Sequence, residues 1–175
     1  FLENAFSTAE GQWSRCLSDV VQRIRAEGDQ FRIREAERKT ISQMAILQMM
    51  RTPGHREDSA QLLDGMISHL RKQGATDEIL LKSSMPLRLS HQDHKAFHLK
   101  TLLDTDSVLQ RQNCILNHIW CFFRVGNHGK LYISDEPVVR RPHLKEGWMS
   151  HSGIASPGIE IAFPLTPDIC LVMFE

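Results

Sequence analysis

The residues most able to do chemistry lie at the end of a helix that the sequence predicts over roughly residues 33–51. Ile41, Met44, Gln48 and Arg51 follow one another at i, i+3, i+7 and i+10, which places them on a single helical face. Two apolar side chains are followed there by two long polar ones, so this face is expected to enter the core and then meet a polar group. A buried guanidinium is costly unless it is paired, and its planar fork fits a carboxylate or a phosphate.

The best carboxylate partner for Arg51 is Asp135. Asp135 follows Ser134 at the end of a predicted strand and precedes Pro137, which marks an abrupt turn. In one interpretation Arg51 is mostly buried and bonds to Asp135, and this structural tie fastens the helical part to the sheet. In the other, Arg51 and Arg56 face an anionic ligand in an open site. We favour the tie, and removing one partner of such a buried pair costs about 3–5 kcal/mol.

A second group of titratable side chains lies on a helix predicted over about residues 90–103. His91, His94 and His98 occur at i, i+3 and i+7 on one face, a spacing that suits metal ligation by imidazole. The apolar residues of this helix project mainly to the other side, namely Ala96, Leu99 and Leu103. The histidines are therefore expected to face solvent, where no neighbouring groups would orient them around a metal. We favour solvated histidines over a metal site.

The thiols are weaker candidates. Cys114 and Cys121 flank His118, which could indicate a nucleophile, but cysteines among aromatic neighbours are more often inert packing. With Cys16 and Cys170 they show no regular spacing, so we expect reduced thiols, no disulfide and a cytoplasmic protein. No glycine-rich phosphate loop, Gly-x-Ser-x-Gly elbow, HExxH or CxxC motif occurs in the sequence.

The elements that must position these residues change character near Asn117. Before it, apolar stripes, helix caps and glycine stops predict helices over about residues 7–28, 33–51, 53–73, 90–103 and 107–116. After it, β-rich segments predict a hairpin over 118–134, a long loop over 140–157 and two strands over 158–163 and 169–174. The prediction is an α+β fold, in which a helical N-terminal two thirds packs on a small, mostly antiparallel C-terminal sheet.

Composition is consistent with a single globular domain over residues 1–175, since 41% of the residues are hydrophobic. The 21 basic residues equal the 21 acidic ones, so no global charge attracts nucleic acid or a membrane surface. The longest apolar run, Ile119 to Phe123, is far shorter than the about 20 residues that cross a bilayer. Because the sequence begins at Phe1 and not at methionine, we expect a fragment of a longer chain whose N-terminal segment is missing.

Three stretches in order match a known pattern: Gln48-Met49-Met50-Arg51-Thr52-Pro53 with Arg56, Tyr132-Ile133-Ser134-Asp135-Glu136-Pro137-Val138, and Ile161-Ala162-Phe163-Pro164-Leu165-Thr166-Pro167. Over nearly its whole length the chain resembles the largely bacterial family known as domain of unknown function 4238. That family carries an Arg-Thr-Pro block, a Ser-Asp-Asn-Pro strand end and a late Pro-Leu-Ser-Pro turn. Glu136 stands where the family usually has asparagine. The resemblance implies a shared fold and a shared polar cluster, but no known activity.

Two function classes follow from these residues. The first, which we favour, is a recognition or binding module whose polar cluster of Gln48, Arg51, Arg56, Ser134 and Asp135 is chiefly structural. The second is a hydrolase or nuclease-like enzyme that acts on a phosphate-containing substrate. Its arginines would hold the anion, and Asp135, Glu136 or Asp168 would be the general base or a metal ligand. The sequence indicates no particular cofactor or partner, although an anionic ligand suits the arginines.

Overall fold

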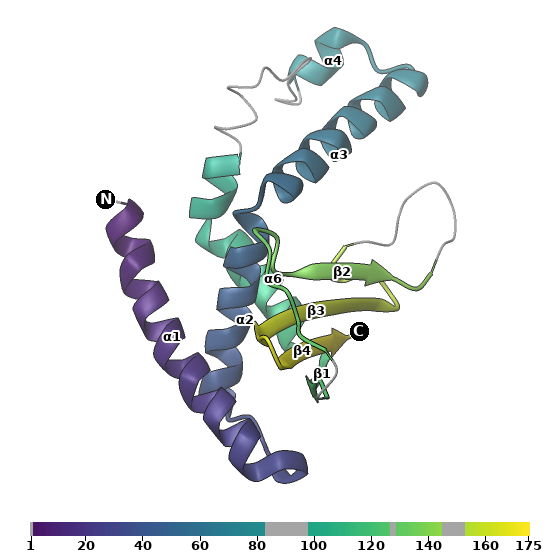
Figure 1. Ribbon diagram of the computed structural model, residues 1–175. Coiled ribbons are helices and arrows are strands. Elements are labelled where there is room, and N and C mark those ends of the chain that lie inside the picture. Colours follow the sequence, from purple (N-terminus) through teal and green to yellow (C-terminus); the bar gives the residue numbers. More distant parts are fainter. Residues whose placement is uncertain (1, 83–97, 127–128, 145–152) are drawn as a thin grey trace. The chain divides into compact units, whose positions relative to one another are not determined.

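The computed structural model describes residues 2–82, 98–126, 129–144 and 153–175. The chain forms two compact units, each described by itself below. The first comprises Phe1–Met49 with Asp106–Glu175, and the second comprises Met50–Thr105. Helices occupy the chain before Asn117 and every strand of the described residues follows it, so the predicted α+β class is confirmed (Figure 1).

The first unit begins with two helices that lie side by side, α1 (Leu2–Glu27) and α2 (Glu35–Met50), joined by the short 3-10 helix η1 (Gly28–Gln30) (Figure 1). The predicted apolar stripe of α1 is real, because Trp13, Val20 and Ile24 are buried. Gly28 ends the helix with a φ of 57°, the left-handed conformation that an L-residue other than glycine adopts at a cost. The helix starts earlier than the predicted residue 7, since it already includes Leu2.

The buried face of α2 lies next to the one that the sequence suggested. Its buried side chains are those of Ile41, Ser42, Ala45, Ile46, Met49 and Met50. At 3.6 residues per turn, position 38 lies on the same face of the helix as Ile41, Ala45 and Met49. Gln48 lies at the margin of this face and is half-buried. A shift of one position around the helix therefore brings Arg38, rather than Arg51, toward the interior.

The C-terminal part of the first unit is a four-stranded antiparallel sheet in the order β1-β4-β3-β2 (Figure 1). Its strands are β1 (Ile119–Arg124), β2 (Val139–Pro142), β3 (Ile159–Thr166) and β4 (Ile169–Phe174). The last two form the predicted pair of strands joined by a tight turn. The predicted hairpin over 118–134 is wrong. Residues 130–134 are not a strand, β1 pairs with β4 instead, and three of the four residues of β2 lie in the segment expected to be a loop.

The inner face of the sheet faces the helices of the first unit, which include α6 (Thr105–Leu116), and α1 contacts β3. Alternate residues of β3 and β4 are buried, in the pattern expected of a sheet with one covered face. On β1, Trp120 lies under the guanidinium of Arg38 from α2, and the Phe122 ring meets Phe31 edge-on at 5.3 Å. The even-numbered residues of β1 therefore point to the helices, and the odd-numbered ones point away from them.

The second unit contains α3 (Pro53–Lys72), α4 (Asp77–Lys82) and a helical segment over residues 98–103. The start of α3 follows the prediction, because the Thr52 side chain accepts a hydrogen bond from His55 N at 3.1 Å and Pro53 occupies the first turn. Gly74 follows the helix with a φ of 93°. The first part of the predicted helix over 90–103 lies outside the described residues.

Candidate functional site

The residues predicted to form the polar cluster are distributed over both units. Gln48, half-buried on α2, and the exposed Ser134 and Asp135, between β1 and β2, belong to the first unit. Arg51 and the half-buried Arg56 belong to the second. Arg51 is exposed, so the prediction that it is mostly buried is wrong. The pairing of Arg51 with Asp135, which belong to different units, stays a prediction.

The turn that carries Asp135 is held by the side chain of Ser134. The Ser134 hydroxyl donates to the carbonyl of Glu136 at 3.0 Å and accepts from the backbone N–H of Glu136 at 3.1 Å. Such local bonding is what a serine before a tight turn provides. Ser134 is therefore a turn former in this unit, and the Asp135 carboxylate projects from an exposed segment.

The arginine that fastens helix to sheet is Arg38. Its Nη2 donates to the carbonyls of Leu116, at 3.0 Å, and His118, at 2.6 Å, at the junction of α6 and β1. The same guanidinium stacks over the Trp120 ring at 4.9 Å. A cation at a helix C-terminus satisfies orphan carbonyls and complements the helix dipole. Arg38 is therefore a structural tie that sequence reasoning missed, and its acceptors are backbone carbonyls instead of a carboxylate.

Two further side chains complete this C-terminal cap of α6. The Trp120 indole N–H donates to the carbonyl of Ile115 at 3.0 Å, and His118 Nδ1 lies 2.9 Å from the carbonyl of Cys114. A carbonyl can only accept, so Nδ1 carries the proton in this contact. His118 is only 3% exposed. Its ring is thus held as part of the helix cap, together with Arg38.

The cysteine nearest to His118 in the sequence is not arranged as a nucleophile. The Cys114 thiol donates to the carbonyl of Ile154 at 3.4 Å, and the His118 ring contacts the backbone of Cys114 and not its sulfur. Burial, and secondly the negative charge of Glu175, raise the pKa of this thiol. Activation requires the opposite shift. All four cysteines are free, which confirms the prediction that no disulfide joins them.

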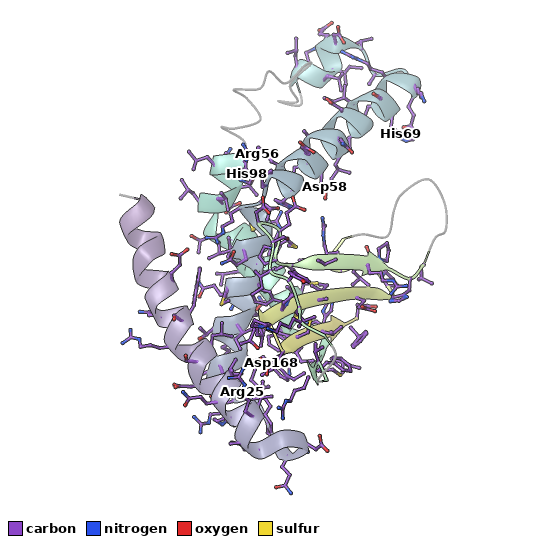
Figure 2. The ribbon with its side chains drawn as sticks, in the orientation of Figure 1. Arg25, Arg56, Asp58, His69, His98 and Asp168 are labelled. Carbon is purple, nitrogen blue, oxygen red and sulfur yellow. The ribbon has the colours of Figure 1, made fainter. Side chains whose placement is uncertain are left out.

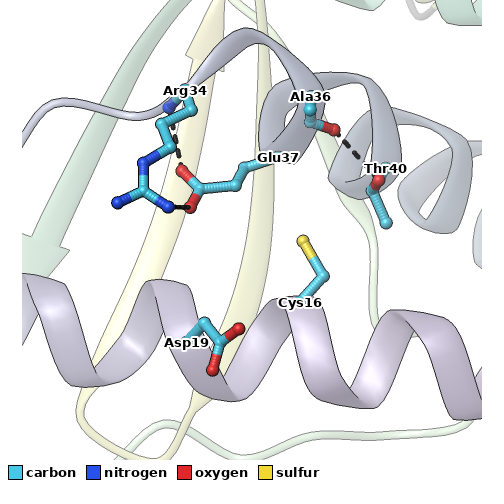
Figure 3. A pocket seen from close by; sticks show the side chains of 6 residues that line it. All are labelled: Cys16, Asp19, Arg34, Ala36, Glu37 and Thr40. Atoms are coloured by element: carbon cyan, nitrogen blue, oxygen red, sulfur yellow. Dashed lines mark hydrogen bonds and ion pairs between the residues drawn. The ribbon is translucent and has the colours of Figure 1, made fainter.

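A groove of about 260 Å³ lies between α1 and α2 and is lined by Cys16, Asp19, Arg34, Ala36, Glu37 and Thr40 (Figure 3). The Glu37 carboxylate on its wall accepts two hydrogen bonds from Arg23 Nη1, of 2.7 and 2.9 Å. Burial, and next the charge of Glu37, raise the pKa of the Cys16 thiol. The groove therefore presents a protonated thiol and a carboxylate already engaged by an arginine, which is a packing arrangement between two helices.

Asp168, one of the residues considered as a general base, is engaged at the turn between β3 and β4. It accepts from Arg25 Nη2 at 2.6 Å and from the Thr166 hydroxyl at 2.8 Å, and Figure 2 shows Arg25 beside it. The hydrogen bond from Arg25 is the main reason that the pKa of this carboxyl is lowered. A carboxylate with a lowered pKa is a weaker base, so this pair serves to join α1 to the sheet.

The second unit brings Arg56 and His98 near each other (Figure 2). His98 is half-buried, and burial followed by the positive charge of Arg56 lowers its pKa. This differs from the solvated histidine that the sequence predicted. Arg56 Nε is buried and has no hydrogen-bond acceptor among the described residues. His91 and His94 lie outside the described residues, and within those residues no three His, Cys, Asp or Glu side chains are grouped as metal ligands.

The outer face of the sheet, which points away from α2 and α6, was not singled out by sequence reasoning. Residues opposite one another in an antiparallel pair share a face, and Val172 of β4 lies opposite both Cys121 and Ala162. This outer face includes nine side chains of apolar or thiol character: Ile119, Cys121 and Phe123 on β1, Cys170, Val172 and Phe174 on β4, Ala162 and Pro164 on β3, and Val139 on β2.

Exposure sets this face apart from the covered one. Ile119, Phe123 and Val139 are 68%, 51% and 57% exposed, and the other six of the nine are half-exposed. Charged groups lie at one corner of the face, where Arg141 is opposite Glu160 and His143 Nε2 meets the Glu160 carboxylate at 2.8 Å. On a sheet with one covered face, the residues that point to solvent are ordinarily mostly polar. The sequence of β1 does not reveal which of its residues form the outer face, because Trp120 to Phe123 are apolar without alternation.

The chain belongs to the DUF4238 family of proteins of unknown function, whose family model matches residues 1–175. This confirms the resemblance drawn from the three sequence motifs. Comparison with curated proteins and with solved structures gives no significant match. Within the part of the chain that the structure describes, no helix combines the length and apolar character that crossing a bilayer requires.

Proposed function

We propose that this chain is a recognition module that binds an apolar polypeptide segment along the outer face of its sheet. The observation that carries the proposal is the exposure of Ile119, Phe123 and Val139 on a face whose other members, away from the charged corner, are also apolar or thiols. Contiguous exposed apolar surface is uncommon on a soluble monomer and marks sites of protein interaction. A sheet surface offers ridges of alternate side chains that suit an extended or helical apolar partner.

The arginines of the first unit support the same function, because their partners are other parts of the fold. Arg38 binds carbonyls at the end of α6, Arg23 binds Glu37, and Arg25 binds Asp168. Each of these charged groups joins one element of the first unit to another. We propose that the motif residues Ser134 and Asp135, in the turn between β1 and β2, are structural as well, and that the exposed Arg51 contributes little to stability.

A selection from a library of random peptides tests the proposed function while the natural partner is still unidentified. We expect the purified chain to enrich peptides rich in apolar and aromatic residues. Binding of these peptides should be lost in Val172→Lys, at the centre of the outer face, and kept in Tyr132→Lys. Tyr132 is 93% exposed and lies outside the strands, so it is a matched control. Enrichment of acidic peptides, or equal binding by both variants, would contradict the proposal.

A second candidate function rests on one specific observation in the second unit. The buried Nε of Arg56 lacks an acceptor among the described residues, and the nearby His98 has a lowered pKa that keeps its ring neutral at pH 7. A phosphate oxygen would supply the missing acceptor. Hydrolysis of bis(4-nitrophenyl) phosphate by the wild-type chain, lost in Arg56→Ala with the fold intact, would establish the hydrolase or nuclease-like alternative in place of recognition.

A further inference from the structure

We infer that the polypeptide bound by this chain is a second copy of itself, paired antiparallel along the edge of β1. The inference rests on the proposed function, names a second copy as the partner, and places it at the β1 edge of the outer face. It follows from three properties of β1: open backbone groups, an edge without protective residues, and a sequence whose antiparallel self-pairing matches apolar side chains with one another.

The open backbone groups follow from the register of the sheet. The N–H of Val125, which continues β1, donates to the carbonyl of Asp168 at 2.9 Å, so odd-numbered positions direct their backbone groups toward β4. The even-numbered positions Trp120, Phe122 and Arg124 therefore direct theirs to the other side. β1 is the first strand of the sheet, so no strand of the described residues pairs with it on that side. These groups form a template for one more strand.

The two edges of the sheet differ in how they are protected. β2, at the opposite edge, has the sequence Val-Arg-Arg-Pro, in which two charged residues and a proline discourage pairing. β1 has the sequence Ile-Trp-Cys-Phe-Phe-Arg, with no proline and with its single charge at the last position. Such residues usually keep edge strands from pairing with another chain, and of the two edge strands only β2 has them. β1 is the edge suited to a partner.

A second copy fits this edge better than an unrelated strand of unknown sequence. Antiparallel pairing about a twofold axis at Cys121 keeps the two outer faces on the same side of the joined sheet. It also places Ile119 of each copy opposite Phe123 of the other. Pairs of aromatic and β-branched residues are favourable across strands. The same pairing holds the two Arg124 side chains at opposite ends, whereas parallel pairing would bring them together. The chain has no net charge, so the copies do not repel each other over longer distances.

The pairing also predicts the size and strength of the assembly. Each copy has one β1, so the twofold contact closes at a dimer and does not propagate. A six-residue strand pair with its flanking side chains buries less than the roughly 1,200 Å² of a typical stable complex. The dimer is therefore weak and forms reversibly with rising concentration. In it, Cys121 faces its own copy in a pair without backbone hydrogen bonds, at a Cα separation of about 4.5 Å.

Sedimentation velocity of the full chain over micromolar to millimolar concentration measures this equilibrium. We expect a monomer–dimer equilibrium, weakened about tenfold or more in the double variant Ile119→Lys/Phe123→Lys, in which the introduced ammonium groups lie opposite one another. Tyr132→Lys is the control, because Tyr132 is 93% exposed and lies outside the strands. It should leave the equilibrium unchanged, and thermal melting of each variant checks the fold.

Cross-linking with a short bismaleimide supplies the second measurement. A covalent dimer should form in the wild type and in Cys170→Ser but not in Cys121→Ser. A monomer at every concentration, oligomers larger than a dimer, or a dimer weakened by Tyr132→Lys would each overturn the inference. A chain that stays monomeric yet binds selected peptides in a Val172-dependent manner overturns self-pairing alone and leaves the proposed recognition function standing.

Discussion

Arg38 Nη2 donates a hydrogen bond of 2.6 Å to the backbone carbonyl of His118, and this contact joins α2 to the point where α6 ends and β1 begins. The guanidinium also bonds to the Leu116 carbonyl and covers the Trp120 ring. One side chain thus holds three elements of the first unit in place. The outer face of the sheet depends on this support, since it positions β1 from the inside.

Removing Arg38 should destabilise the first unit. Arg38→Ala leaves two carbonyls without their charged donor and uncovers Trp120, so we expect a loss of about 2–4 kcal/mol in the free energy of unfolding. Urea denaturation measures the loss. Arg34→Ala is the control, because the Arg34 side chain is 71% exposed and should cost less than about 1 kcal/mol. An equal effect of the two substitutions would show that the Arg38 contacts are not a structural tie.

Arg51 and Asp135 should behave differently from Arg38. Both are exposed, so we expect Arg51→Ala and Asp135→Ala each to lower the free energy of unfolding by less than about 1 kcal/mol. The double variant adds the two effects if the residues do not interact. A loss of about 3–5 kcal/mol in each single variant, with a double variant that falls short of the sum, would restore the buried tie that the sequence predicts for this pair.

The difference between the two arginines shows how far the sequence could predict the structure. Caps and periodic stripes identified the helices, and the helix predicted to begin at residue 53 does begin at Pro53. The charged run that contains Arg38 is typical of a solvated face, and the partners of Arg38 are backbone carbonyls, which no residue type reveals. The strand β2 was missed because arginines and proline are poor strand signals, and their position at a sheet edge depends on the whole topology.

Asp168 should make stability depend on acidic pH. Its pKa is lowered in the folded chain, chiefly by the hydrogen bond from Arg25, so the unfolded chain binds the proton more readily. The stabilisation is therefore complete above an ordinary aspartate pKa of about 4 and is lost as pH falls through the lower folded value. The difference in Tm between the wild type and Asp168→Asn should shrink in acid. A difference that is constant with pH would show that the carboxylate charge does not contribute.

Three of the four half-buried thiols should react slowly. Burial raises the pKa of Cys16, Cys114 and Cys170, so each has less thiolate at neutral pH than an ordinary cysteine. Alkylation by iodoacetamide, followed by peptide mass spectrometry, should be slower at these positions in the folded chain than in the chain unfolded in urea. Rates should rise with pH. A Cys114 that reacts faster when folded would indicate an activated nucleophile next to His118 and would favour an enzyme.

Mapping backbone amide chemical shifts while a selected apolar peptide is titrated into the labelled chain tests the central claim most directly. Recognition through the outer face predicts the largest shifts on β1 and β4, around Cys121 and Val172, with the signals of Arg51, Arg56 and Asp135 unchanged. Shifts that concentrate instead around Arg51, Arg56 and Asp135, and leave β1 and β4 unaffected, would contradict this account and place the binding site in the polar cluster.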